Sequence, residues 1–376
     1  MIWNDKVGSV SASPHEARSV IKRKVTVMRK RSMRVPRTTI VAAAACVVAM
    51  VAWSVPASGT SVAQRTQTGK AAVAKSASTA PIAIAAAVAD SADPFYLTME
   101  CGAKAASKIY NVKLTWQGSP SIDVAPEVAT LQAVELRNPA GIILAPFSPT
   151  VFIAPVKALM AKGVPVVTVD GSLAQKVELQ NVRTNNTAAG ALAAQYLANK
   201  LKGKGTVGVV DSTPSIPVDV DRVNGFRNEM KAKYPHITVL GTQYAESDAG
   251  KAATITSALL EAHPNLSGLY VSDAGDAQGA AAAIVAAGDL GKVPIVGYDA
   301  TPVEVTDLQD GVFTALIAQE PYQEGYQAVS VLARYIRHQI TKAQIPYLYG
   351  TGAVVVTKGN MNNPQMKKVL YTTTCG

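Results

Sequence analysis

The sequence holds few of the side chains from which enzyme sites are commonly built. Its 376 residues include only four histidines and three cysteines. The histidines are scattered, which speaks against a metal site or a catalytic triad. No Gly-x-Gly-x-x-Gly run follows the first predicted strand, and phosphate-loop and His-Glu-x-x-His motifs are missing. We therefore expect a protein that is not an enzyme and that holds no cofactor or metal ion.

The sequence also has almost no net charge over most of its length. Residues 1–80 carry 13 Lys/Arg and 2 Asp/Glu, whereas residues 81–376 carry 23 and 24. The formal charge of +10 therefore belongs to the N-terminal end. A neutral body offers no basic surface that would follow a phosphate backbone, so we expect no nucleic-acid partner.

The N-terminal end has the order of a secretory signal. Basic residues from Arg29 to Arg37 precede an apolar run over 40–55, and small residues follow up to Ala63. We expect residues 1–63 to be a signal peptide with a polar leader, which predicts a secreted protein at the periplasmic or extracellular face of the membrane. The run is short for a membrane span, although an uncleaved anchor is the alternative.

Residues 64–80 are rich in Ala, Ser, Thr, Gln and Lys, a composition typical of a disordered tether. Cys46 lies in the apolar run and should leave with the signal. Cys101 and Cys375 are then an even pair in an oxidising compartment, which permits one disulfide. Two unpaired thiols are the alternative.

From Pro81 onward, short apolar runs alternate with helical patterns of about a dozen residues. The runs are apolar without strict alternation, as expected for parallel strands buried on both faces. Apolar stripes at helical spacing, such as the one from Ala189 to Leu197, lie between them. This order predicts a doubly wound α/β fold. The predicted strands are 82–89, 112–116, 141–146, 164–170, 206–211, 268–273, 293–299 and 313–318.

Two of these runs resemble each other, which suggests two similar lobes. Residues 164–170 and 293–299 share the pattern Val-Pro-apolar-Val-x-x-Asp. Both end in aspartate, as do the runs that end at Asp211 and Asp273. The carboxyl ends of strands in open α/β sheets face the ligand crevice, so these carboxylates could accept hydrogen bonds from ligand hydroxyls. Capping of the following helix is the alternative for each of them.

Aromatic residues follow the first predicted strand. Asp93 and Pro94 precede Phe95 and Tyr96, which could stack on a sugar ring while the carboxylate binds its hydroxyls. The alternative is a helix that begins at the proline and buries its first aromatic residue in the core.

An ordered set of short motifs resembles the ribose-type, type I periplasmic sugar-binding proteins of ABC importers. The resemblance covers residues 81 to about 358. It is carried by Pro94-Phe95-Tyr96, Val164–Asp170, Asn224-Gly225-Phe226, Ala262-His263-Pro264, Val296–Asp299 with Thr301-Pro302, and Ile317-Ala318-Gln319.

The resemblance implies two Rossmann-like lobes with parallel sheets, joined by three hinge strands, that close on a small polar ligand. It implies an N-terminal lobe of residues 81–184 plus 320–349 and a C-terminal lobe of 185–319 plus 350–376. The tail, 359–376, could pack back on the N-terminal lobe. The implied partners are an ABC permease and the small polar ligand. The protein itself is expected to be a monomer. A sensory co-receptor in chemotaxis would use the same binding event. The implied ligand-binding residues are Asp93, Phe95, Tyr96, Asp170, Asp273, Asp299 and Gln319. Phe147 and Ser247 should line the same cleft.

The sequence departs from the family at two arginines. Gly171 stands where the ribose-type pattern has an arginine after the aspartate, and a second family arginine falls near Val220. The departure predicts a pocket without guanidinium groups and with four carboxylates. Such a pocket favours a donor-rich ligand, such as a polyol, an altered sugar or an amine, over ribose. Entry of Arg183 or Arg222 into the cleft would remove this preference.

Overall fold

The first sheet belongs to an N-terminal lobe. The computed structural model describes residues 80–121 and 123–375. In this sheet the strand order is β11-β5-β4-β3-β1-β2, and every pair is parallel. Its strands are β1 (Ile82–Val88), β2 (Val112–Gly118), β3 (Gly141–Leu144), β4 (Val166–Val169), β5 (Gln180–Thr184) and β11 (Leu348–Thr351).

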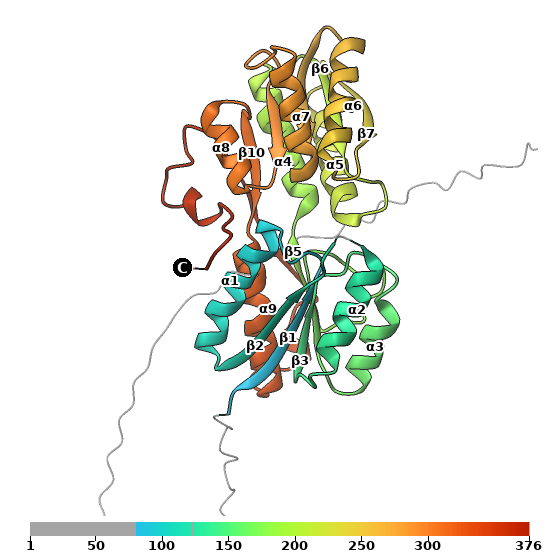
Figure 1. The fold of residues 1–376 in the computed structure, drawn as a ribbon, viewed down its shortest axis with the longest axis vertical. Coiled ribbons are helices and arrows are strands. Elements are labelled where there is room, and N and C mark those ends of the chain that lie inside the picture. The colour runs from blue at the N-terminus through green and yellow to red at the C-terminus, as the bar shows by residue number, and fades with distance from the viewer. Residues whose placement is uncertain (1–79, 122, 376) are drawn as a thin grey trace, which may run out of the picture. The chain divides into compact units, whose positions relative to one another are not determined.

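Two pairs of helices cover the two faces of this sheet. They are α1 (Pro94–Ile109) with α9 (Pro321–Ile336) on one face, and α2 (Val124–Glu135) with α3 (Ile153–Ala161) on the other (Figure 1). Ile84 and Ala86 of β1 pack against α1 and α9, whereas Ala85 and Ala87 pack against α2 and α3. Burial on both faces explains why the strands read as continuous apolar runs.

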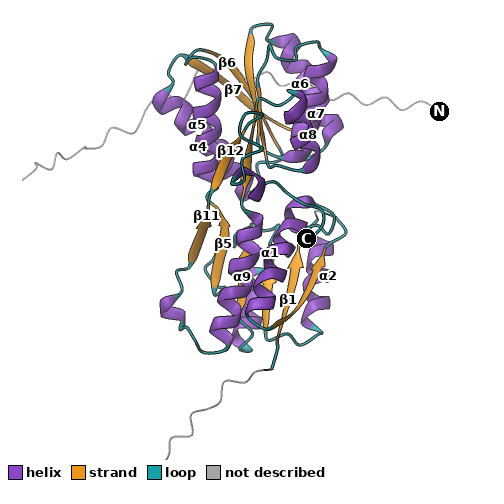
Figure 2. Ribbon diagram, turned by 90° about the vertical axis from the view of Figure 1, so that its left-hand side faces the viewer, coloured by secondary structure: helices purple, strands orange, loops and turns teal. Residues whose placement is uncertain are grey.

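The second sheet belongs to a C-terminal lobe and has the strand order β12-β10-β9-β8-β6-β7. Helices α4 (Asn186–Lys200) and α5 (Pro217–Lys233) cover one face, and α6 (Ala249–Ala262), α7 (Ala274–Ala286) and α8 (Pro302–Asp310) cover the other (Figure 2). Its strands are β6 (Gly205–Asp211), β7 (Ile237–Tyr244), β8 (Leu266–Val271), β9 (Ile295–Tyr298), β10 (Ala315–Gln319) and β12 (Ala353–Val356).

The chain passes between the two sheets three times. The passages follow β5 into α4, β10 into α9, and β11 into β12. The buried carboxyl of Glu324, in the first turn of α9, accepts hydrogen bonds from Thr184 at 3.0 Å and Thr351 at 3.1 Å, the last residues of β5 and β11. The Glu324 carboxyl group therefore contacts the ends of β5 and β11, where two of the passages begin. Glu324 itself lies on α9, which follows the third passage.

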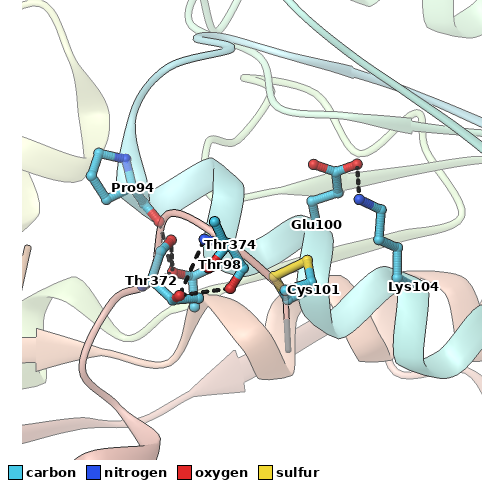
Figure 3. The surroundings of a disulfide bond; sticks show 8 residues. Pro94, Thr98, Glu100, Cys101, Lys104, Thr372 and Thr374 are labelled. Atoms are coloured by element: carbon cyan, nitrogen blue, oxygen red, sulfur yellow. Dashed lines mark hydrogen bonds and ion pairs between the residues drawn. A yellow bond between two sulfur atoms is a disulfide. The ribbon is translucent and has the colours of Figure 1, made fainter.

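The residues after β12 form a tail that contacts the N-terminal lobe. Thr372 exchanges hydrogen bonds with the side chain of Thr98 on α1, at 2.8 and 3.2 Å. Cys375 forms a disulfide with Cys101 of the same helix, with 5.2 Å between the Cα atoms (Figure 3). The last described residues of the chain are therefore bound covalently to α1.

The predicted fold class, two α/β lobes with parallel sheets, is confirmed. The structure adds four strands that the apolar runs did not predict: β5, β7, β11 and β12. It also differs at β12, which pairs with β10 in the antiparallel direction because the chain continues from β11 straight into the second sheet, starting beside the end of β10. The predicted signal and tether lie outside the described residues, apart from Ala80. Within the described part of the chain, no helix is both long enough and apolar enough to span a membrane.

Candidate functional site

A polar cavity of about 90 Å³ lies where strand ends of both sheets meet. All nine residues predicted for the site line it. The structure adds five that were not predicted: Ala89, Ile216, Val218, Asp219 and Arg222.

The N-terminal lobe supplies the aromatic wall. The carboxylate of Asp93 accepts a hydrogen bond from the Phe95 backbone N–H at 2.8 Å and so caps α1, which begins at Pro94. Phe95 and Tyr96 are buried and meet edge to face with 5.2 Å between ring centres. Both rings pack into the core and also border the cavity, so the two sequence interpretations of this segment hold together.

Asp170 and Asp299 occupy equivalent positions directly after β4 and β9. Each has a left-handed backbone, with φ of 57° and 80°. The backbone N–H of each donates to the neighbouring strand, Asp170 to Val182 at 3.0 Å and Asp299 to Ile317 at 2.9 Å. Neither caps a helix. This conformation bends the chain away from the strand at the point where the side chain borders the cavity.

The two carboxylates have different partners. Oδ2 of Asp170 accepts the hydroxyl of Tyr96 at 2.7 Å. Oδ1 of Asp299 accepts both Nε2 of Gln319 at 2.7 Å and the hydroxyl of Tyr371 at 2.9 Å. Tyr371 belongs to the tail and was not predicted, because that segment has no periodic pattern.

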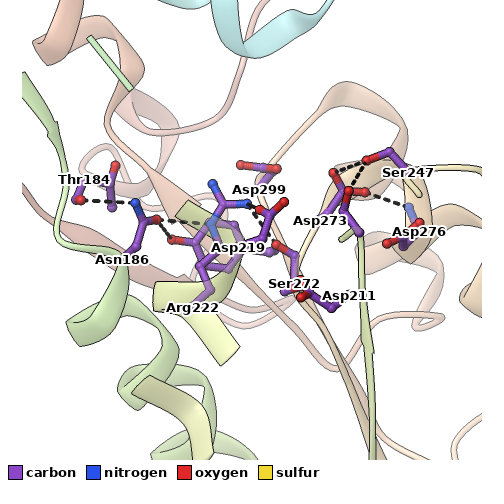
Figure 4. A network of polar contacts seen from close by, with 12 residues as sticks. Thr184, Asn186, Asp211, Asp219, Arg222, Ser247, Ser272, Asp273, Asp276 and Asp299 are labelled. Atoms are coloured by element: carbon purple, nitrogen blue, oxygen red, sulfur yellow. Dashed lines mark hydrogen bonds and ion pairs between the residues drawn. The ribbon is translucent and has the colours of Figure 1, made fainter. Parts of the chain in front are cut away.

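Arg222 is the cation of the cavity wall (Figure 4). Nε donates to Asn186 at 3.1 Å, and Nη1 donates to Asp219 at 3.0 Å and to the Ser272 carbonyl at 2.9 Å. The guanidinium carbon lies 3.9 Å from the centre of the Tyr298 ring. These contacts leave Nη2 without a protein hydrogen-bond partner in the described part of the chain.

Close helix packing places this arginine. A Cβ added at Gly190 of α4 would lie 1.9 Å from the Arg222 carbonyl oxygen, so only glycine allows α5 to approach so closely. Asn185 caps α4 through its side chain, and Asn186, the first residue of that helix, accepts hydrogen bonds from both Arg222 and Tyr298. Asn186 therefore both begins α4 and orients the cation.

The remaining wall of the C-terminal lobe is a chain of hydroxyls and carboxylates. Ser247 donates at 3.0 Å either to Asp273 or to Ser212. Asp273 also caps α7 by accepting the backbone N–H of Asp276, so the capping interpretation is correct for this aspartate. Asp211 lies at the end of β6, is buried, accepts a short hydrogen bond from Ser272, and does not border the cavity.

Burial controls the charge of the carboxyl groups. Desolvation raises the pKa of Asp93 to about 7, although the Phe95 N–H opposes it. Desolvation also raises the pKa of Asp170 and Asp299, against the stabilising hydrogen bonds and the nearby Arg222. Burial lowers the pKa of Arg222, but Tyr298, Asp219 and Asp299 outweigh it and raise the pKa, so this group stays a cation.

The expectation of a pocket without guanidinium groups is wrong. Arg222 reaches the cavity from a position two residues after Val220, where the family arginine was expected, because the second turn of α5 lies at the cavity wall. Arg183 does not border the cavity and pairs with Asp221 at 3.4 Å. The cavity therefore holds one guanidinium and five aspartates, and the preference for a donor-rich ligand over a pentose loses its basis.

The described residues include no group of three or more His, Cys, Asp or Glu side chains placed to hold a metal ion. Two α/β lobes with a shared polar cavity at their strand ends define a two-lobed binding protein. The family model of the periplasmic binding protein domain matches residues 84–340, and the chain belongs to this family.

Relatives and solved structures agree with this assignment. The D-allose-binding periplasmic protein of Escherichia coli K12 is 27% identical over 253 residues, which cover 64% of this chain and 80% of that protein. The ribose import binding protein RbsB of Haemophilus influenzae is 28% identical and covers 72% of this chain and 91% of its own. An ABC transporter solute-binding protein from Agrobacterium vitis, solved with α-D-tagatopyranose, superposes with a TM-score of 0.73 at 31% identity and covers 77% of this chain and 99% of its own.

Proposed function

We propose that this protein is the extracytoplasmic solute receptor of an ABC importer and that it captures a monosaccharide between its lobes. The observation that carries the proposal is the composition of the cavity wall. Carboxylates and one guanidinium from both lobes surround a space bordered on one side by Phe95, Tyr96 and Phe147. Aromatic rings suit the apolar face of a sugar ring, and the charged groups suit its hydroxyls.

Two unpaired polar atoms of the wall match a sugar hydroxyl, which both donates and accepts. Oε1 of Gln319 is buried and has no hydrogen-bond partner among the described residues. Nη2 of Arg222 still has N–H groups to donate. A neutral polyhydroxyl ligand would satisfy both atoms, and it also fits a site where burial raises the pKa of several carboxyl groups.

The mechanism we propose is closure. The ligand contacts aspartates of both lobes, so it stabilises the arrangement in which the two walls meet, and the permease would recognise that arrangement. The relatives named periplasmic or import binding proteins support an extracytoplasmic location and an ABC permease as partner. We propose that the receptor acts as a monomer and releases its sugar chemically unchanged.

Calorimetric titration of the full chain tests the proposal. The panel contains D-ribose, D-allose, D-arabinose, D-fucose and D-tagatose, with glycerol and an amino sugar as comparison ligands. We expect one or more of the neutral sugars to bind in the micromolar range or tighter, and the bound sugar to be recovered unchanged. Binding of the amino sugar alone would contradict the choice of a neutral ligand, and no binding by any sugar would contradict the function.

A further inference from the structure

Tyr371 connects the two walls of the cavity, although it belongs to the tail. Its hydroxyl donates to Oδ1 of Asp299 at 2.9 Å, and its backbone N–H donates to the Ala300 carbonyl at 2.9 Å, both in the C-terminal lobe. Its ring meets the edge of Phe95, in the N-terminal lobe, with 5.8 Å between ring centres. The side chain is 5% exposed.

The contacts of Asp299 show why this phenol matters. Oδ1 accepts two hydrogen bonds, from Gln319 and from Tyr371, whereas Oδ2 has no hydrogen-bond partner in the described part of the chain. Two donors on one oxygen fix the rotation of the carboxyl group, so that the second oxygen stays available to a ligand. Each donor also favours the ionised form of the aspartate.

The disulfide holds the phenol in place. Three residues lie between Tyr371 and Cys375, so the chain from one Cα atom to the other spans at most about 14 Å. The bond from Cys375 to Cys101 fixes one end of this short segment to α1, and the hydrogen bonds between Thr98 and Thr372 fix the residue directly after Tyr371. Cys375 is exposed, so a reductant can reach the bond.

We propose that Tyr371 is a positioning residue of the ligand site and that the Cys101–Cys375 disulfide sets ligand affinity by keeping Tyr371 on Asp299. The proposal rests on the proposed function, because it assumes that Asp299 binds the sugar. It predicts that a covalent bond distant from the cavity changes affinity through one hydroxyl group. Reduction of the bond therefore weakens binding, and its formation completes the site.

The first test compares Tyr371→Phe with the parent in the full chain, by calorimetric titration with the sugar of the panel that binds the parent most tightly. The variant keeps the ring against Phe95 and removes the donor to Asp299. We expect the Kd to increase about 5- to 20-fold at pH 7. The matched control is Tyr322→Phe, an exposed tyrosine at the start of α9, which should leave the Kd unchanged.

A pH profile separates positioning from a structural defect. Loss of the donor raises the pKa of Asp299, so affinity should begin to fall at a higher pH in Tyr371→Phe than in the parent as the solution is acidified. Other ionisable groups also act on Asp299 and are the same in both proteins: Arg222, Asp273, Asp93, Asp170 and Glu304. An unchanged pH profile would overturn the role of the phenol.

The second test asks whether the disulfide acts through Tyr371. We expect dithiothreitol to raise the Kd of the folded parent about 3- to 10-fold, and Cys101→Ser/Cys375→Ser to match the reduced parent. In the Tyr371→Phe background, reduction should add little, because the two changes remove the same interaction. Equal losses in both backgrounds would overturn the link between the disulfide and the phenol.

The outcomes separate this inference from the proposed function. A parent that binds a sugar together with a Tyr371→Phe variant of the same affinity overturns the inference and leaves the function standing. A parent that binds no sugar overturns both.

Discussion

The two lobes present one aspartate each from the third strand of their sheets, and the two aspartates differ in what supports them. Asp170 follows β4 and Asp299 follows β9, both with left-handed backbones. Asp170 takes its partner, Tyr96, from its own lobe, whereas Asp299 takes Gln319 from the neighbouring strand and Tyr371 from the tail. A repeated backbone feature thus carries two side chains whose surroundings have diverged.

The lobes also differ in charge at the cavity. The N-terminal lobe contributes Asp93 and Asp170 with three aromatic rings and no cation, and the C-terminal lobe contributes Arg222 with three aspartates. Hydroxyl-rich ligands need both donors and acceptors. The N-terminal lobe therefore supplies the ring contacts of the cavity, and the C-terminal lobe supplies most of its charged groups.

The largest expected effect comes from removing the cation. Arg222→Met leaves Asp219 buried without its partner, so we expect sugar binding to fall by more than about 100-fold and the free energy of unfolding to fall by about 3–5 kcal/mol. Calorimetric titration and chemical denaturation measure the two effects. Arg183→Met, which breaks a partly exposed pair between β5 and α5 outside the cavity, should cost less than about 1 kcal/mol and leave binding intact. Equal effects of the two variants would contradict the assignment.

The next largest effect on sugar binding is expected at Asp170 and Asp299. Asn tolerates a left-handed backbone, so Asp170→Asn and Asp299→Asn should keep the fold and remove only the charge. Each should weaken sugar binding about 10- to 100-fold, since each loses a hydrogen bond to a charged group. Titration of both variants with the same sugar tests whether the two walls contribute equally. Parent-like affinity in both would remove these residues from the site.

Each lobe also holds buried carboxyl groups whose pKa is strongly raised, and Glu324 and Asp276 represent the two lobes. Desolvation raises the pKa of Glu324 and of Asp276 to about 8, from 4.5 and 3.8. Between the lower and the upper values the folded protein keeps a proton that the unfolded chain has released, so stability falls as the pH rises and is level above about 8.

We therefore expect the melting temperature of the parent to fall between pH 6 and pH 8. Glu324→Gln and Asp276→Asn should each reduce this fall by about 2–4 °C. Thermal denaturation across the pH range measures it. A slope that neither variant changes would show that these carboxyls are ionised in both states.

The smallest expected effect is at Ser247, whose hydroxyl donates at 3.0 Å either to Asp273 or to Ser212. Ser247→Ala removes a hydrogen bond that Asp273 accepts from within the cavity wall, and we expect the Kd to rise about 2- to 10-fold. Ser148→Ala, beside Phe147 in the other lobe, should change the Kd less than twofold. A loss above 100-fold at Ser247 would indicate that it contacts the ligand directly and strongly.

The sequence predicted the parts of this structure that follow from strand and helix alternation. Strands buried on both faces read as apolar runs, and the residue after each run marks the edge where the cavity lies. Asp170, Asp273 and Asp299 were identified in this way. The edge strands β7 and β11 were missed because they are half exposed, so their sequences lack a continuous apolar run.

The missed site residues lie off the strand ends. Arg222 is on the second turn of α5. Its place at the cavity depends on the close contact between Gly190 of α4 and the backbone of Arg222, which no local sequence pattern shows. Tyr371 is in an irregular segment, and its contact with Asp299 joins residues far apart in the sequence. Such contacts require the whole fold.

The three passages between the lobes also determine the order in which the chain can fold. Residues 185–319 supply five of the six strands of the C-terminal lobe in one stretch, whereas the N-terminal lobe needs α9 to cover one face of its sheet and β11 to complete its edge. One face of the early strands of the N-terminal lobe therefore stays only partly covered, by α1, until residues 185–319 have been synthesised and α9 follows. The disulfide of Cys101 can form only later still, because Cys375 follows at a sequence separation of 274 residues. We expect the C-terminal lobe to form first during synthesis, and the first strands of the N-terminal lobe to be among the last elements to reach their final contacts.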